Sequence, residues 1–466
     1  MTSEDTHRTQ QERVSTITEG SVWKAVWTLS WPTMISMFLY GAYNWINRMF
    51  VGRGLGTESI DAVGLGGNVL MIIFALTMGI TAGTTALVAR FTGAKSHSEA
   101  VAAAKQSIIL SLIVSAIVTL PFVLVARPLL AFTGAKGQVM PLAMSYTVVC
   151  TLSTAPLFLF MMIGAIFRGL GDMKTPLYGT LIVTVINIVM DYVLIFGIDP
   201  FPRMGVTGAA VAVAISRTFA LVASVVWLMR SPLRDSLSRP WTPHIEWMTR
   251  ILRISGPAIL QGLMFSLNFV ALLATIGRLS HVTEAQAAWF IGSGAEALAY
   301  MPGFAFMTAA TSLVGQNLGA RRPDRAERGA WICAWQCVAV MSAMAAVFYI
   351  FARQFATMFL RPDATNAALV IDYSVRYLRI NAISEPFFGF GMVFSGAMQG
   401  AGDTKTPTWV AFITMWVIRL PLTYVWAVVF GGHVTAAWIV VCATTSLRGL
   451  IMIALFKRGK WKTVQV

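Results

Sequence analysis

Charged residues are scarce in this sequence. Only 12% of its 466 residues are Asp, Glu, Lys or Arg, whereas a soluble globular chain carries about 25%. The shortage runs along the whole chain, which is 56% hydrophobic, and this composition is typical of an integral membrane protein. The net charge of +15 does not indicate a nucleic-acid partner, because the basic residues are dispersed among short polar segments and form no single face or tail.

Cysteine and histidine are also rare. The four cysteines, Cys150, Cys333, Cys337 and Cys442, all lie within apolar segments, so we expect no disulfide framework. Cys333 and Cys337 are one helical turn apart, but a structural metal site normally has four ligands and no histidine lies near them. We therefore interpret these thiols as packing groups and expect no metal site.

Motifs for nucleotide and metal chemistry are missing. No G-x-x-x-x-G-K-[ST] loop is present, since the TGAKS segment at residues 92–96 has no upstream glycine, and this excludes ATP-driven chemistry encoded in the chain. The motif H-E-x-x-H is absent as well, which argues against an embedded metalloenzyme. We therefore expect neither an enzyme nor a bound cofactor.

The first 20 residues are polar and contain no apolar core and no small-residue cleavage site. They do not have the pattern of a signal peptide. We predict that they are a disordered tail, and we assign residues 1–22 to the cytoplasm.

Long apolar runs are what the sequence has in abundance. A run of about 20 residues forms a helix long enough to cross ~30 Å of hydrocarbon. Twelve such runs predict an all-α membrane protein with twelve transmembrane helices. The predicted spans cover residues 25–50, 62–90, 103–126, 139–167, 177–198, 205–229, 250–277, 285–317, 329–352, 369–399, 407–430 and 434–456.

The polar segments between these runs alternate between two levels of positive charge. One alternate set is rich in Lys and Arg, with Arg321, Arg322, Arg325 and Arg328 in a single segment, whereas the other set has few basic residues. Because basic loops tend to stay in the cytoplasm, we predict that both termini are cytoplasmic. A bacterial-type inner membrane is the expected location.

One polar phrase occurs twice. FRGLGDMKTP at residues 167–176 recurs as MQGAGDTKTP at residues 398–407, 231 positions later. Both copies keep the aspartate, as Asp172 and Asp403, together with a glycine before it and a proline after it. We interpret the phrase as a turn that joins two helices and acts as a possible hinge.

A second echo lies in other loops of the two halves. TAGTTALVARFTGAK at residues 81–95 recurs as TAATSLVGQNLGAR at residues 308–321, and Gly93 matches Gly319 at an offset of 226. The ordered echoes show that the second half of the chain repeats the first.

The repeats predict two lobes of six helices each, residues 23–235 and 236–466. Because six is an even number, both lobes enter the membrane in the same orientation and are related by a pseudo-two-fold axis along the membrane normal. This arrangement places a cavity between the lobes, and rocking of the lobes would open it to each side in turn.

The repeated phrases and their neighbours resemble those of multidrug and toxic compound extrusion (MATE) transporters. The resemblance rests on FRGLGDMKTP followed by INIVMDYVLIFG, on LVGQNLGA, and on MQGAGDTKTP followed by WVIRLPL, and it extends in order from about Trp23 to Trp461. It implies two lobes of six helices and the cation-coupled export of chemically diverse, often cationic, organic compounds.

Asp191 is the first candidate for the coupling chemistry. Ionisable side chains within a membrane span are costly, so each is a functional candidate, and Asn187 lies one turn before Asp191 on the same helix face. Burial favours the neutral acid and would allow proton exchange, whereas a carboxylate beside an amide oxygen would bind Na⁺. The resemblance places an acidic cation site at these two positions.

The sequence departs from the family pattern at this site. An Asp is common in a YN-x-x-D context of the first helix, but the segment YNWIN has Asn47 there. A hydroxyl is common in a GAAxAT run of the sixth helix, but GAAVAV gives Val213. Both departures remove an oxygen ligand for Na⁺, so H⁺ coupling is favoured, with Na⁺ as the alternative.

The second lobe has its own charged residues within spans. Glu296, Glu385 and Arg419 lie at similar depth, so we expect them to meet, with one glutamate neutralising Arg419 and the other free for a proton or a cationic substrate. A purely structural cluster is the alternative. For the substrate cavity, the sequence suggests Tyr43, Trp45, Phe265 and Trp289, although most such residues in membrane proteins pack or face lipid. 

We expect a secondary active antiporter that exports small organic compounds, cationic or amphipathic, in exchange for H⁺ or Na⁺, and that works as a monomer. A flippase for lipid-linked oligosaccharides is an alternative, but it would be expected to line its cavity with several cationic residues for phosphate. A passive channel is an alternative of another class, and the unlike charges of the two lobes argue against it.

Overall fold

The computed structural model describes residues 3–234, 241–279, 281–358, 366–431 and 433–464. The protein is 87% helical, and the described residues contain no strand. The first half of the chain forms α1 (Ser3–Thr18), α2 (Val22–Leu55), α3 (Thr57–Gly93), α4 (His97–Phe132), α5 (Val139–Leu152), α6 (Thr154–Gly169), α7 (Lys174–Phe196) and α8 (Gly205–Met229). The second half forms α10 (Ile245–Ile276), α11 (Val282–Gly319), α12 (Pro323–Ile350), α13 (Ala352–Met358), α14 (Ala367–Ala382), α15 (Glu385–Ala401), α16 (Lys405–Phe412), the π-helix η1 (Ile413–Arg419), α17 (Leu420–Thr423), the π-helix η2 (Tyr424–Val429), α18 (Val434–Lys457) and the short 3₁₀-helix η3 (Lys460–Thr463).

The twelve predicted spans are all present as helices. Among the described residues, nine helices are long and apolar enough to cross a membrane, and the pair α5–α6, bent by 47°, counts as a tenth. Helix α2 and the pair α14–α15 occupy the two remaining predicted spans, 25–50 and 369–399. Helices α16, η1, α17 and η2 together form one span, Lys405–Val429. The predicted fold class is therefore confirmed.

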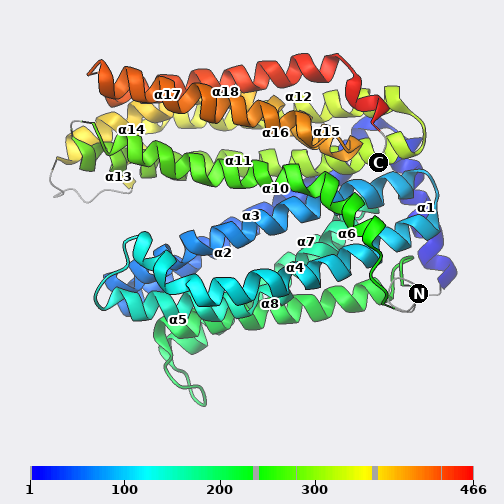
Figure 1. The fold of residues 1–466 in the computed structure, drawn as a ribbon, viewed down its shortest axis with the longest axis horizontal. Coiled ribbons are helices and arrows are strands. Elements are labelled where there is room, and N and C mark those ends of the chain that lie inside the picture. The colour runs from blue at the N-terminus through cyan, green and yellow to red at the C-terminus, as the bar shows by residue number, and fades with distance from the viewer. Residues whose placement is uncertain (1–2, 235–240, 280, 359–365, 432, 465–466) are drawn as a thin grey trace.

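The helices form two layers in Figure 1, α2 to α8 in one and α10 to α18 in the other. We call these layers the N-lobe and the C-lobe. Both chain termini lie at the same end of the molecule, which we call the terminal end (Figure 1). The two layers lie close together at the terminal end and diverge toward the opposite end.

The hydrophobic cores show the same asymmetry between the two ends. At the terminal end, Val26 and Leu29 of α2 share a core with Phe306 of the C-lobe, and Ile251 and Ile254 of α10 share a core with the N-lobe. At the opposite end, each described core belongs to a single lobe. The lobes are therefore joined at the terminal end and parted at the opposite one.

Glycines permit the closest approach between the lobes, where α3 crosses α11. A Cβ atom on Gly93 would overlap the carbonyl oxygen of Gln316, and one on Gly319 would overlap the carbonyl oxygen of Arg90. At the offset of 226 that relates the two halves, Arg90 corresponds to Gln316 and Gly93 corresponds to Gly319. The two contacts are therefore reciprocal, and the pseudo-two-fold axis passes between them.

The repeated phrase forms a helix-joining turn in both lobes, as predicted. Gly171 and Gly402 have φ angles of +81° and +93°, which are favourable only for glycine. Asp172 accepts hydrogen bonds from the backbone N–H groups of the first residues of α7 and from the hydroxyl of Thr175. Asp403 accepts from the backbone N–H and the hydroxyl of Thr406 near the start of α16. The carboxylates satisfy the free N–H groups of a helix start, which explains why the phrase keeps its aspartate.

The prediction of a disordered N-terminal tail is wrong. Residues Ser3–Thr18 form α1, and Val14 and Ile17 of this helix are buried. These two residues are three apart, so they lie on one face of α1, and this face is buried. The segment is too polar for its composition to indicate a helix, and its order comes from tertiary contacts instead.

The cysteines are packing groups, as their apolar segments suggested. All four cysteines are buried and free. The Cys333 thiol donates to the carbonyl oxygen of Phe306, and Cys337 lies beside Met341. The thiols thus pack within the lobes.

Candidate functional site

Three side chains from two helices of the N-lobe meet around one carboxyl group. Asp191 and Asn187 lie one turn apart on α7, and Asn47 faces them from α2. Asn47 Nδ2 donates a hydrogen bond to Asp191 Oδ2 at 2.9 Å. When the Asn187 amide is assigned the orientation that pairs both of its ends, its nitrogen donates to the same oxygen at 2.8 Å and its oxygen accepts from the Val213 N–H at 3.2 Å. The structure thus brings together the three residues predicted for this site.

The second carboxyl oxygen of Asp191 has no hydrogen-bond partner among the described residues. Asp191 and Asn187 are 0% exposed and Asn47 is 5% exposed. Within the described residues, Asp191 Oδ1 is buried and has no hydrogen-bond partner. A buried negative charge is costly when it is not fully hydrogen-bonded, and a proton on Oδ1 would remove that charge. The geometry therefore suits reversible protonation at one defined oxygen.

The same geometry supplies few oxygen ligands for a metal ion. Hard cations are bound by roughly six oxygens, but Asn47 turns its nitrogen toward Asp191, and Asn187 does so in the amide orientation that pairs both of its ends. Val213, which stands where the family pattern has a hydroxyl, offers only its backbone. A cation at this place would have Asp191 Oδ1 as its one open side-chain oxygen among these residues.

An arginine that the sequence reasoning missed lies in the same lobe. Arg217 on α8 donates to the carbonyl oxygen of Cys150 at 3.3 Å and to Ser153 Oγ at 2.9 Å. These two acceptors lie at the break between α5 and α6, where a bend leaves a helix carbonyl without its usual partner. Arg217 therefore stabilises the bend. Its position, twelve residues into an apolar span, was a signal that could have identified it.

Two carboxyl groups lie side by side in the C-lobe. Glu296 comes from α11 and Glu385 is the first residue of α15, and they are 8% and 2% exposed. The Tyr377 hydroxyl donates to Glu296 Oε2 at 2.6 Å, and Tyr300 lies beside the same carboxyl. Glu385 Oε2 has no hydrogen-bond partner in the described structure. Because two like charges repel strongly in a buried site, this pair is suited to hold one proton between them.

The predicted ion pair of Arg419 is absent from the described structure. Arg419 donates instead to the hydroxyls of Thr444 and Thr445 on α18, at 2.8 and 2.7 Å. It lies at the end of the π-helix η1, whose wider turn changes the direction of its last side chain relative to a regular α-helix. Arg419 is nevertheless close enough for its charge to act on Glu296. The three residues meet as an electrostatic cluster and not as a salt bridge.

A second buried arginine of the C-lobe was also missed. Arg448 on α18 is 6% exposed, and its guanidinium lies over the ring of Phe265 at 4.8 Å from the ring centre. Its Nε atom has no hydrogen-bond partner in the part of the chain that the structure describes. Phe265 therefore stabilises a buried cation by a cation–π contact. Like Arg217, Arg448 interrupts an apolar run, and this was the available signal.

The four residues suggested for a substrate cavity differ in their surroundings. Tyr43 is half-buried and packs against the N-lobe core that contains Val51 and Tyr146. Phe265 contacts Arg448. Trp289 is 5% exposed and packs against Tyr377 and Trp438, which makes it a core residue and not a lining one. The side chain of Trp45 lies outside the described residues.

The sequence of this chain is similar to those of known transporters. The sequence model of the family MatE matches residues 32–193 and 257–425, one segment in each lobe. The chain is 25% identical to "Uncharacterized transporter YisQ" of Bacillus subtilis over 445 residues, which cover 94% of each protein. It is 27% identical to "Probable multidrug resistance protein NorM" of Thermotoga maritima over 444 residues, or 93% of this chain and 92% of the relative.

Solved structures agree with the sequence comparison. An outward-facing multidrug resistance MATE family transporter of the MOP superfamily superposes with a TM-score of 0.88. The sequence identity is 25%, and the superposition covers 97% of this chain and 98% of that one. MATE transporter structures have twelve helices in two lobes, as this protein has.

Proposed function

This chain belongs to the MatE family of multidrug and toxic compound efflux transporters, and from that premise we propose that it is an antiporter that exports small organic compounds in exchange for protons. The relatives are transporters and not enzymes, and we extend this to the present chain. Asp191 carries the coupling proton. The observation that supports this proposal is a buried Oδ1 atom with no partner among the described residues, beside an Oδ2 atom that accepts from Asn47 and, in its paired amide orientation, from Asn187.

The basic residues support an orientation of the protein in the membrane. The segment with Arg321, Arg322, Arg325 and Arg328 joins α11 to α12 at the terminal end, which is therefore the cytoplasmic end of an inner-membrane protein. The lobes are joined at this end and parted at the other. The structure then represents an outward-facing state, in which a proton reaches Asp191 and substrate leaves. Coupling requires that protonation lowers the affinity for substrate in this state.

The substrates are organic compounds that are cationic or amphipathic, and the protein acts as a monomer. The buried acids of both lobes support a cationic class, since Asp191, Glu296 and Glu385 each offer a negative charge when ionised. Uptake into everted membrane vesicles tests the proposal, with imposed proton and sodium gradients applied separately to a panel of organic cations. Proton-driven uptake that saturates with substrate is expected, whereas non-saturating flux in either direction would indicate a channel.

The choice of proton over sodium makes a specific prediction. Replacing Asn47 with Asp and Val213 with Thr adds the two oxygens by which this chain departs from the family pattern. We expect the double variant to gain sodium-driven transport at least about tenfold above the wild-type level, because affinity for hard cations rises with ligand charge and number. Asn47→Ala, which removes a donor and adds no oxygen, serves as the control. Sodium-driven transport by the wild type would contradict the proposal.

The acidic pair of the C-lobe makes a second prediction. If Glu385 attracts cationic substrate, Glu385→Gln should raise the KM for an organic cation by about tenfold, or 1.4 kcal/mol, and leave the pH profile of transport in place. The same change at Glu246, which is exposed on α10, is the control. A purely structural role would instead lower the amount of folded protein with KM unchanged, as gel filtration and transport assays would show.

A further inference from the structure

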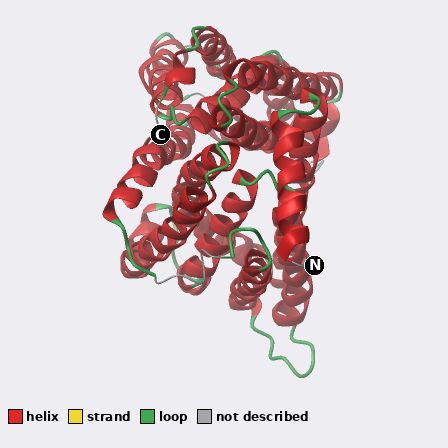
Figure 2. Cartoon of the chain, turned by 90° about the vertical axis from the view of Figure 1, so that its right-hand side faces the viewer, coloured by secondary structure: helices red, strands yellow, loops and turns green. Residues whose placement is uncertain are grey.

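Helix α1 crosses the terminal end from one lobe to the other. Figure 2, which looks at this end, shows the N-terminal helix in front of the other helices, running between the two groups. Figure 1 shows the same helix at the terminal end, beside both layers. The predicted spans do not include α1, and a transporter of two six-helix lobes does not require it.

The contacts of α1 with the N-lobe involve the repeated turn. Gln10 Nε2 donates to the carbonyl oxygen of Leu170 at 2.9 Å, and Arg13 Nη1 forms a salt bridge with Asp172 Oδ2 at 2.7 Å. The Asp172 side chain is 7% exposed and that of Arg13 is 38% exposed. The salt bridge is therefore anchored on a nearly buried carboxylate that also caps α7.

The contacts with the C-lobe involve the last carbonyl groups of α1. Asn317 Nδ2 and the Arg325 guanidinium donate to the carbonyl oxygen of Ile17, and Arg322 donates to that of Thr18 at 2.8 Å. Carbonyl groups at a helix C-terminus carry partial negative charge, so two arginines there are favourable. The Ile17 side chain, 3% exposed, belongs to the core that contains Phe306 and Leu313 of α11.

We propose that α1 is a strap that holds the two lobes together at the terminal end and stabilises the outward-facing state. This inference rests on the proposed alternating access. Opening of the terminal end would move the turn at residues 170–172 away from the α11–α12 turn at residues 317–325. Helix α1 is bonded to both turns, so one set of bonds must break before the lobes separate.

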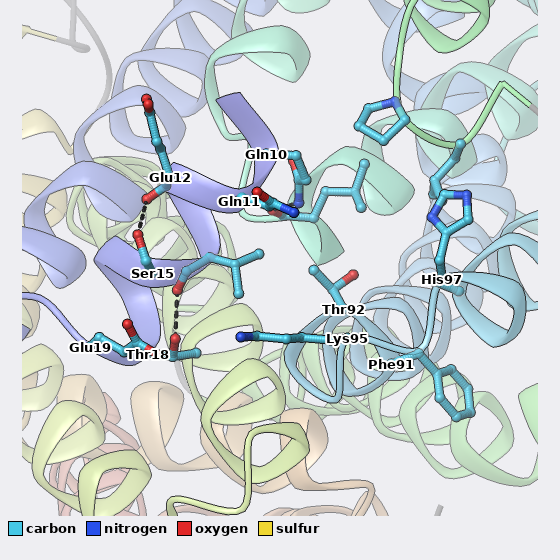
Figure 3. Close-up of a pocket in the computed structure, with 15 residues that line it drawn as sticks. Gln10, Gln11, Glu12, Ser15, Thr18, Glu19, Phe91, Thr92, Lys95 and His97 are labelled. Atoms are coloured by element: carbon cyan, nitrogen blue, oxygen red, sulfur yellow. Dashed lines mark hydrogen bonds between the residues drawn. The ribbon is translucent and has the colours of Figure 1, made fainter. Parts of the chain in front are cut away.

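The strap is poised to move because it is not packed solidly against the N-lobe. A cavity of about 650 Å³ lies between α1 and the turn that joins α3 to α4. Gln10, Gln11 and Ser15 line it from α1, and Thr92, Lys95 and His97 line it from the other side (Figure 3). Polar side chains from both walls face the cavity beside apolar ones such as Phe91 and Leu233, so water can enter the space and replace contacts that a dense apolar core would hold fixed.

The test measures the distance between the lobes at the opposite end. Spin labels at Lys136 of the N-lobe and Arg353 of the C-lobe, both exposed, report a long distance in the outward-facing state and a short one when the terminal end opens. The native cysteines are buried, so they leave the labelled positions unique. Arg13→Ala and Arg325→Ala should each raise the ratio of short to long distances by about fivefold, the effect expected for one partly exposed ionic or carbonyl contact.

Matched controls separate the strap from general effects of mutation. Arg328 is exposed on the same helix as Arg325, and Gln11 is exposed on α1, and neither takes part in the bridging bonds described above. Arg328→Ala and Gln11→Ala should keep the wild-type distances, and Arg13→Lys should restore most of the long-distance population. Wild-type distance distributions in both Arg13→Ala and Arg325→Ala would overturn the proposal. The measurement needs no substrate or ion gradient, so failure of the transport proposal would show separately, as absent proton-driven uptake.

Discussion

Asp191→Asn is expected to abolish proton-driven export while the protein stays folded in the membrane. The substitution keeps the size of the side chain and can still accept from Asn47 and Asn187 through its amide oxygen. It replaces the open Oδ1 atom with an NH₂ group, which cannot bind and release a proton between about pH 5 and 9. Export driven by an imposed pH gradient in proteoliposomes should fall by about 100-fold or more, because a loss of coupling leaves only downhill flux.

Two comparisons make this result specific. The same substitution at Asp372, which pairs with Arg376 on the exposed surface of α14, should leave export unchanged. Counterflow, the exchange of labelled for unlabelled substrate without a gradient, should continue in Asp191→Asn, since it requires alternating access and no proton. Undiminished gradient-driven export by Asp191→Asn would refute the mechanism.

The sequence predicted the architecture well because the membrane imposes strong patterns. Long apolar runs, alternating loop charges and the two copies of the repeated phrase led to twelve helices in two lobes, and the structure agrees. The N-lobe site was also accessible to sequence reasoning, because Asn187 and Asp191 are one turn apart on one helix. Asn47 could be added only because the resemblance indicated which residue of α2 faces them.

The failures share a physical origin. The order of α1 depends on arginines and carbonyl groups more than 300 residues apart, such as Arg325 and Ile17, and no local pattern encodes such contacts. Arg419 was expected to pair with a carboxylate, but the π-helical turn before it directs the guanidinium toward two threonine hydroxyls. Span depth alone does not determine which side of a helix a residue faces.

The two lobes differ in charge although their scaffolds match. MDYVLIFG at residues 190–197 aligns with LTYVWAVVFG at residues 422–431, which pairs Asp191 with Thr423. TAPLFLF at residues 154–160 aligns with SEPFFGF at residues 384–390, which pairs Ala155 with Glu385. Each lobe thus has buried acids where the other has none. In the proposed mechanism Asp191 binds the proton in one lobe and the C-lobe pair attracts the substrate in the other. Proton and substrate would then bind at different sites and compete because both sites are coupled to the movement of the lobes.

Gly93→Ala is expected to shift the protein away from the outward-facing state more strongly than loss of any single side-chain contact. The added Cβ atom would overlap the carbonyl oxygen of Gln316 across the axis, and both partners are backbone-anchored, so neither can turn aside. Overpacking of this kind costs about 1–3 kcal/mol. The cost applies only while α3 and α11 touch at the terminal end, so opening of that end relieves it. The Lys136–Arg353 spin-label distance should therefore shorten in most molecules.

The decisive comparison is with the substitution at the symmetry-related glycine. Gly319→Ala would overlap the carbonyl oxygen of Arg90 in the reciprocal contact, and it should shift the distance by the same amount and in the same direction. The double variant should fall short of the sum of the two single effects, because one opening relieves both overlaps and coupled sites are not additive. Gly67→Ala is the control, since it lies on α3 with open space around its Cβ position. Equal effects of Gly67→Ala and Gly93→Ala would mean that helix propensity, and not contact at the axis, sets the balance.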